Sequence, residues 1–174
     1  MGRPATHGAP KQAYRREADA LRVVVDHVRA YEPDGLMGFS QGSNVASLLM
    51  SALENGADLG DARHPRFLVS FCGTHWGWAD DFRARSDAVA RGAGLKLATP
   101  LYSSKLRVPS LHVIADDDPR KDFSESFKAL FENPVVRRAP NSHKPPVEPR
   151  FADEIAAFLQ GALAGETRTS ESPP

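Results

Sequence analysis

Residues 35–42, Gly-Leu-Met-Gly-Phe-Ser-Gln-Gly, decide the fold of this chain. An apolar strand, Leu36 to Phe39, runs into a Gly-x-Ser-x-Gly pattern, and apolar side chains at helical spacing follow it directly. A serine on so tight a strand-to-helix turn occupies strained backbone, and we expect the glycines on both sides of it to let the strand and the helix approach. The alternative is that Ser40 only caps the helix that follows.

Strand-like and helix-like segments alternate along the rest of the chain, whereas residues 74–108 are weakly patterned and predict loops with a short helix. The other expected elements, in chain order, are a helix over about 13–31, the strand Leu36–Phe39, a helix ending near Asn55-Gly56, a strand over Phe67–Cys72, a strand over Ser110–Ile114, a helix around Phe123–Phe131, a strand at Val135–Val136 and a helix over about 149–163. This alternation predicts an α/β fold, with a parallel sheet covered by helices on both faces.

The composition predicts one globular domain, over 13–163, between a loose leader at 1–12 and a disordered tail at 164–174. The 22 basic and 22 acidic residues cancel, so nucleic acid is not an expected partner. No apolar run approaches the roughly 18 residues that cross a bilayer. The single cysteine, Cys72, excludes an internal disulfide and fits a reducing, cytoplasmic compartment. No His-Glu-x-x-His or paired-histidine spacing is present, so we expect no metal or other cofactor.

A serine, a run of aspartates and a histidine each follow a predicted strand, in the order of a Ser-Asp-His triad. A serine hydroxyl becomes a nucleophile only when a base takes its proton and an acid orients that base. His143 lies in the loop between the fourth strand and the last helix, and the run Asp116-Asp117-Asp118 follows the third strand, with at most one of the three expected to be catalytic. His75, after the second strand, is the alternative base. The other histidines are expected to be surface or core residues: His7, His27, His64 and His112.

The chain resembles the FSH-type serine hydrolases of the α/β-hydrolase superfamily. The similar segments are residues 35–42, Pro109–Ile114 with Asp118, and His143-Lys144-Pro145-Pro146, within a resemblance over about 13–163. It implies Ser40 as nucleophile, Asp118 as acid and His143 as base, with the backbone N–H of Gln41 stabilising the oxyanion. It also implies a carboxylesterase or thioesterase whose substrate is a small acyl ester or thioester.

The chain departs from that family pattern near its N-terminus. Family members open with an apolar strand and a His-Gly loop that supplies a second oxyanion N–H. Here His7-Gly8 follows Arg3-Pro4-Ala5-Thr6, which is not strand-like, and Asn141-Ser142 replaces the usual Gly-Gly before the base. We therefore weigh two hypotheses. The chain is a serine hydrolase, or it is a non-catalytic hydrolase-like fragment that pairs with another chain, as in a homodimer, through the open edge of the Leu36–Phe39 strand.

Overall fold

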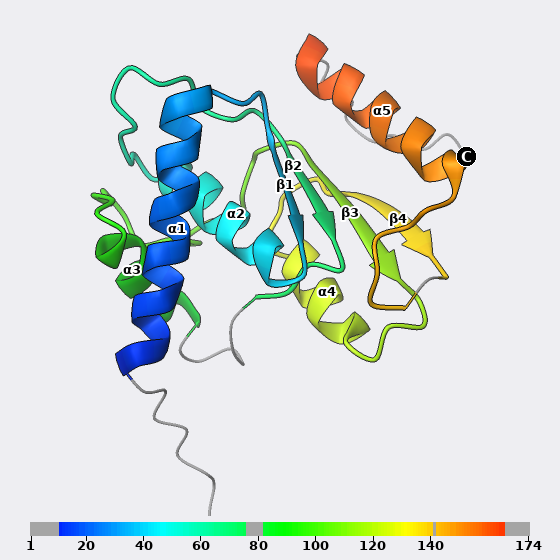
Figure 1. Ribbon diagram of the computed structural model, residues 1–174, viewed down its shortest axis with the longest axis horizontal. Coiled ribbons are helices and arrows are strands. Elements are labelled where there is room, and N and C mark those ends of the chain that lie inside the picture. Colours follow the sequence, from blue (N-terminus) through cyan, green and yellow to red (C-terminus); the bar gives the residue numbers. More distant parts are fainter. Residues whose placement is uncertain (1–10, 76–81, 141, 166–174) are drawn as a thin grey trace, which may run out of the picture.

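The computed structural model describes residues 11–75, 82–140 and 142–165, which form a parallel sheet with the strand order β1-β2-β3-β4 (Figure 1). The strands are β1 (Leu36–Phe39), β2 (Leu68–Phe71), β3 (Ser110–Ala115) and β4 (Val135–Ala139). The helices are α1 (Lys11–Tyr31), α2 (Gln41–Glu54), α3 (Phe82–Gly92), α4 (Lys121–Lys128) and α5 (Pro149–Ala164). This arrangement confirms the α/β class that the alternating pattern predicts. The expected leader and tail fall largely on residues 1–10 and 166–174, which lie outside the described residues.

Helices cover both faces of the sheet. The larger core packs α1, α2 and α3, together with Phe127 of α4, against one face, and among the described helices α5 covers the other (Figure 1). Because successive side chains of a strand point to opposite faces, Leu68 belongs to the first core and Val69 to the second. Both residues are fully buried, as expected for a strand inside a parallel sheet.

The weakly patterned stretch contains the short helix that the sequence predicts. The described part of residues 74–108 contains the 11-residue helix α3, which is tied to α1 by a partly buried ion pair between Arg85 and Glu17. Arg22 of α1 also donates to the carbonyl oxygen of Gly92 at 2.6 Å. These contacts join positions about 70 residues apart, so the local spacing of apolar residues cannot predict them.

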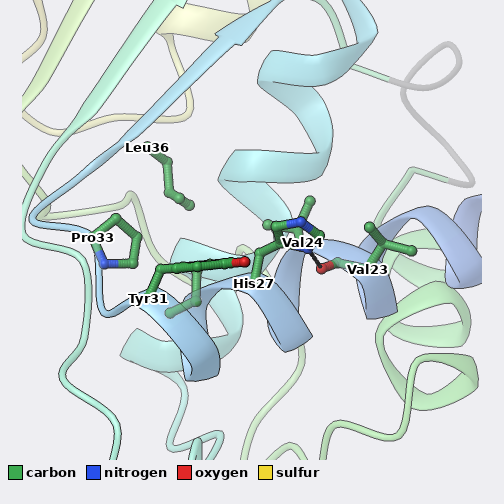
Figure 2. Close-up of a pocket in the computed structure, with 7 residues that line it drawn as sticks. Val23, Val24, His27, Tyr31, Pro33 and Leu36 are labelled. Atoms are coloured by element: carbon green, nitrogen blue, oxygen red, sulfur yellow. Dashed lines mark hydrogen bonds between the residues drawn. The ribbon is translucent and has the colours of Figure 1, made fainter.

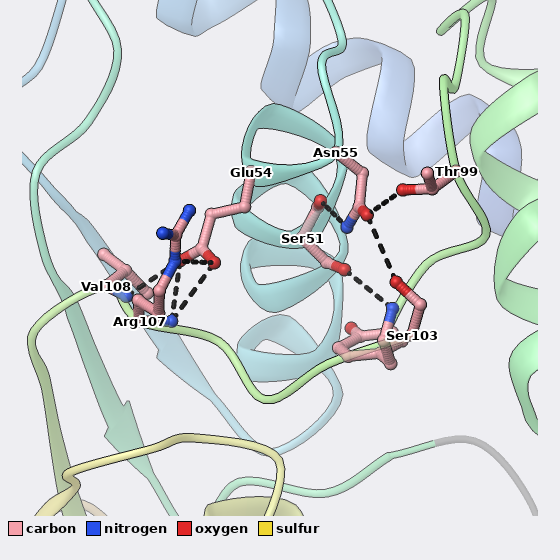
Figure 3. Close-up of polar contacts among 8 residues, drawn as sticks. Ser51, Glu54, Asn55, Thr99, Ser103, Arg107 and Val108 are labelled. Carbon is pink, nitrogen blue, oxygen red and sulfur yellow. Dashed lines mark hydrogen bonds and ion pairs between the residues drawn. The ribbon is translucent and has the colours of Figure 1, made fainter.

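Polar side chains at the end of α2 hold the segment that leads into β3 (Figure 3). The Glu54 carboxylate accepts the backbone N–H groups of Arg107 and Val108, and the Ser51 hydroxyl accepts that of Tyr102 at 3.1 Å. Backbone donors away from a helix or sheet need such partners, because a buried unpaired N–H is costly. In this segment, side-chain oxygens of α2 therefore accept the backbone N–H groups that would otherwise bond within a helix or a sheet.

The helix expected around Phe123–Phe131 ends earlier than its apolar spacing predicts. α4 stops at Lys128, and the chain then pairs its backbone with Leu106, which donates to the Leu130 carbonyl at 2.8 Å. Phe131 lies beyond the helix but is still buried, because its ring packs against that of Phe127. Phe131 is buried without being part of the helix, so its apolar side chain does not mark the end of the helix. The predicted boundary at Phe131 is therefore wrong.

The first strand forms one edge of the described sheet. The Leu36 N–H donates at 3.0 Å to the carbonyl oxygen of Phe67, just before β2, and the Ser40 N–H donates at 2.9 Å to that of Phe71 in β2. Because backbone groups alternate along a strand, those of Met37 and Phe39 point away from β2, and no described strand pairs with them. Their side chains are 60% and 40% exposed. The edge therefore exposes both backbone and apolar groups, as the sequence predicts.

An apolar groove lies beside this edge on the α1 face of the sheet (Figure 2). We call it the edge groove, and its lining residues are Val23, Val24, His27, Val28, Tyr31, Pro33 and Leu36. No helix in the described part of the chain is both long and apolar enough to cross a membrane.

Candidate active site

Ser40 occupies a strained backbone conformation at the turn between β1 and α2. Its φ of 51° and ψ of −119° lie where a residue with a Cβ is rarely found. The Ser40 side chain makes no capping hydrogen bond to the helix that follows. The alternative that Ser40 is only a helix cap is therefore wrong.

The two glycines of the motif have different roles. A Cβ on Gly38 would lie 2.5 Å from the backbone N and Cα of Ser43, so only glycine lets β1 pass the first turn of α2. A Cβ on Gly42 would have no neighbour within 4 Å among the described residues. The expectation that both glycines are needed for close approach is correct for Gly38 and wrong for Gly42, which lies on the exposed side of the helix.

Three side chains that are far apart in the sequence form one chain of hydrogen bonds. His143 Nε2 lies 3.0 Å from Ser40 Oγ, and His143 Nδ1 lies 2.6 Å from Asp118 Oδ2. Ser40 follows β1, Asp118 follows β3 and His143 follows β4. Parallel strands place their carboxyl ends at one edge of the sheet, and this brings together residues from three loops.

Asp118 is held as a carboxylate in a buried position. Its residue is 5% exposed, and burial by itself would raise the pKa of its carboxyl group. Hydrogen bonds from His143 and from the Arg120 backbone N–H, the latter at 2.8 Å, outweigh this and hold the pKa below its usual range. The carboxylate is therefore ionised at neutral pH and accepts from both sides.

The two preceding aspartates serve other partners. Asp117 Oδ1 accepts the backbone N–H of Ser142 at 2.5 Å and so ties down the loop that carries His143. Asp116 is exposed and forms an ion pair with Lys121 at 2.7 Å. Among the three aspartates, only Asp118 contacts the imidazole. Asp117 is a supporting residue that the sequence did not single out, since nothing in an Asp-Asp-Asp run distinguishes its members.

The other described histidines have surroundings different from those of His143. The ring of His75, the alternative base, packs against that of Phe82 with their centres 4.8 Å apart. His112 is buried and hydrogen-bonded to Ser110, and burial, followed by the nearby charge of Lys128, lowers its pKa to about 3. His27 and His64 are exposed, and His7 lies outside the described residues. His112 is thus the satisfied core histidine that its place in a strand predicts.

Cys72 is a further neighbour of the site that sequence reasoning missed. It follows β2 with a φ of 46°, and its thiol lies 3.8 Å from the carbonyl oxygens of Ser142 and Lys144, on either side of His143. Burial, followed by the Asp118 charge, raises the pKa of this thiol. Cys72 is therefore a protonated thiol at neutral pH.

Gln41 opens α2, directly after Ser40. The first backbone N–H groups of a helix have no acceptor within the helix, and the helix dipole favours negative charge there. The Gln41 N–H therefore lies at the start of the helix, directly after Ser40, and its role toward a substrate oxyanion stays a prediction.

The parallel sheet with its helices and the strand-to-helix serine define an α/β-hydrolase fold. The structure resembles that of Zea mays acyl-protein thioesterase 2, with a TM-score of 0.54, 17% identity, and coverage of 84% of this chain and 66% of that chain. At this identity the likeness shows the fold alone.

The sequence defines the family. The model of the serine hydrolase (FSH1) family matches residues 4–155, so the chain belongs to that family. The chain is 36% identical over 153 residues to Esterase OVCA2 of Bos taurus, covering 85% of this chain and 57% of that protein. It is 26% identical over 155 residues to Esterase AGAP003155 of Anopheles gambiae, covering 88% and 51%. The chain spans about half the length of these curated relatives.

Substitution of the two motif glycines by alanine tests the turn. We expect Gly38→Ala to destabilise the fold by about 1–3 kcal/mol or more, because its Cβ meets backbone that cannot move aside. The matched variant Gly42→Ala should change stability by less than about 1 kcal/mol, and in the stabilising direction, because alanine favours a helix. Urea unfolding followed by circular dichroism measures both. Equal losses in the two variants would contradict this account of the turn.

Proposed function

We propose that this protein is a serine hydrolase that cleaves small acyl esters or thioesters through an acyl-enzyme intermediate. The observation that carries the proposal is the hydrogen-bonded chain from Asp118 through His143 to Ser40. Such a chain on a strained strand-to-helix turn is the arrangement that activates a serine. The names of the relatives, which are esterases, support the same class of reaction.

The first half of the reaction forms the acyl-enzyme. Ser40 Oγ attacks the carbonyl carbon of the substrate while His143 Nε2 takes the hydroxyl proton. The carbonyl oxygen becomes an oxyanion, and the Gln41 N–H donates to it. Collapse of the tetrahedral intermediate breaks the bond to the leaving alcohol or thiol, which receives the proton from His143. The acyl group remains on Ser40 Oγ.

The second half returns the enzyme to its starting state. A water molecule gives a proton to His143 Nε2 and attacks the acyl carbon. The second tetrahedral intermediate releases the carboxylic acid, and the proton returns to Ser40 Oγ. In both halves the Asp118 carboxylate accepts a hydrogen bond from His143 Nδ1–H, which keeps Nε2 available as the proton acceptor and stabilises the imidazolium.

Alanine variants of Ser40 and His143 test the proposal directly. We expect Ser40→Ala and His143→Ala each to lower hydrolysis of short p-nitrophenyl esters by at least about 10³-fold, because members of such a unit do not act additively. Ser40→Ala should also abolish labelling by a fluorophosphonate probe. The control His75→Ala, whose ring packs on Phe82, should keep both properties. Unchanged hydrolysis in Ser40→Ala, or a loss confined to His75→Ala, would refute the assignment.

The three aspartates offer a matched series. We expect Asp118→Asn to reduce kcat by about 10³- to 10⁴-fold, because an amide can donate to Nδ1 and fix the wrong tautomer. Asp117→Asn keeps an oxygen that can accept the Ser142 N–H, and Asp116→Asn lies at the surface, so each should lose less than about tenfold. Steady-state kinetics of the three variants separate these cases. Small, equal losses would place the acid elsewhere.

The open edge of β1 supports a second candidate function, association with a second copy of the chain. An antiparallel pair centred on Gly38 would place Met37 opposite Phe39 of the second copy, and the outward N–H and C=O groups of these residues would bond across the edge. Both exposed side chains would then lie on one face, where cross-strand apolar pairs stabilise a sheet. On the other face, the uncharged edge groove would meet its own copy (Figure 2). A second copy of the chain is a suitable partner because it presents the same uncharged edge groove to the first copy.

A charge at this edge tests the association. We expect the chain to elute as a dimer in size-exclusion chromatography with light scattering and Met37→Lys to elute as a monomer, because the lysine would lose hydration at the pair. The control Val147→Lys changes a residue that is 90% exposed and is not part of β1, and it should remain a dimer. A monomeric wild type at every concentration would end this candidate. A dimer without fluorophosphonate labelling would favour it over the hydrolase.

A further inference from the structure

We propose that Cys72, Asp118 and His143 form a binding site for a zinc ion, and that zinc held there switches off the base. The effect on activity rests on the proposed hydrolase function, whereas the binding itself does not. The site supplies three kinds of ligand: a thiolate, a carboxylate and an imidazole nitrogen. This mixed set suits Zn²⁺, because a soft sulfur ligand favours it over the hard cations Mg²⁺ and Ca²⁺.

The three ligand atoms already lie together. Cys72 Sγ, a carboxylate oxygen of Asp118 and a ring nitrogen of His143 are all within 4.8 Å of one another. They follow β2, β3 and β4, which are neighbouring strands of the sheet (Figure 1). Cys72 and Asp118 are 2% and 5% exposed, so two of the ligands lie inside the fold. His143 is more exposed and gives the ion a path from solvent.

A modest movement converts this group into a zinc site. Zinc–ligand bonds of about 2.0–2.3 Å in a tetrahedron place these ligand atoms about 3.3–3.6 Å apart. The thiol therefore moves inward by about 1 Å, which breaks its weak contacts at 3.8 Å with the carbonyl oxygens of Ser142 and Lys144. The Asp118–His143 hydrogen bond of 2.6 Å must lengthen. Zinc binding and the Asp118–His143 hydrogen bond are therefore mutually exclusive.

The proton balance explains the loss of the base. Zinc bonds to the sulfur as the Cys72 thiol releases one proton to water. The neutral imidazole of His143 keeps one proton, and zinc at Nδ1 forces this proton onto Nε2. Nε2 then donates toward Ser40 and cannot take the hydroxyl proton. Asp118 is already ionised and releases nothing, so one proton leaves for each ion bound. A water molecule can take the fourth position on the metal.

The binding test does not depend on hydrolysis. Zinc is titrated against a chromophoric chelator with wild type, Ser40→Ala, Cys72→Ala and Cys72→Ser, and circular dichroism checks each fold. We expect one zinc ion per chain in wild type and in Ser40→Ala, and affinity about 100-fold weaker in both Cys72 variants. Co²⁺ bound to wild type should give a near-ultraviolet thiolate charge-transfer band that Cys72→Ser lacks. The control His75→Ala, a second histidine near the end of β2, should bind like wild type.

The activity test measures the fraction of each variant's own metal-free rate that remains with zinc. We expect zinc to inhibit wild type reversibly, with recovery on addition of EDTA, and to inhibit Cys72→Ala only at about 100-fold higher concentration. Equal inhibition of wild type and Cys72→Ala, or no thiolate band with Co²⁺, would overturn the proposal. Loss of zinc binding in His75→Ala alone would also overturn it. Zinc binding by a wild type that hydrolyses nothing would instead count against the proposed function.

Discussion

The backbone at Ser40 is the constraint on which the rest of the structure depends. A residue with a Cβ avoids a φ of 51°, so the turn persists only because β1 and α2 are held on both sides of it. The contact of Gly38 with Ser43 fixes how closely the strand and helix approach, and the hydroxyl of Ser43 accepts that of Ser70 in β2 at 3.0 Å. The strain thus points the Ser40 side chain out of the sheet, toward the loops at its carboxyl end.

A sheet of four strands is sufficient to assemble the site because its members follow β1, β3 and β4. The chain spans about half the length of its curated relatives, yet the described residues contain a complete path from carboxylate to imidazole to hydroxyl. The loops that carry these groups are tied to one another, as in the bond from Ser142 to Asp117. Such ties matter because a catalytic group on a loop keeps its position only when neighbouring contacts restrict the loop.

The strand that ends in Ser40 is also the edge of the described sheet, and this joins two properties of the molecule. In an open parallel sheet, ligands bind beyond the carboxyl ends of the strands, so whatever pairs with β1 also borders the serine. A partner at the edge would cover Met37 and Phe39, and Phe39 in turn packs its ring against His143, with ring centres 5.1 Å apart. Covering the edge would therefore also change the surroundings of His143.

The sequence by itself determined the class of fold and the order of the functional residues. The alternation of period two and period 3.6, with Ser40 between strand and helix and with Asp118 and His143 after later strands, is local information that short segments carry. It could not choose among Asp116, Asp117 and Asp118 on physical grounds, because the choice depends on which carboxylate meets a loop 25 residues away. Nor could it reveal the packing of α3 on α1, the freedom at Gly42 or the place of Cys72 beside His143. Those features depend on distances between segments far apart in the chain, which only the packing of the sheet and its helices decides.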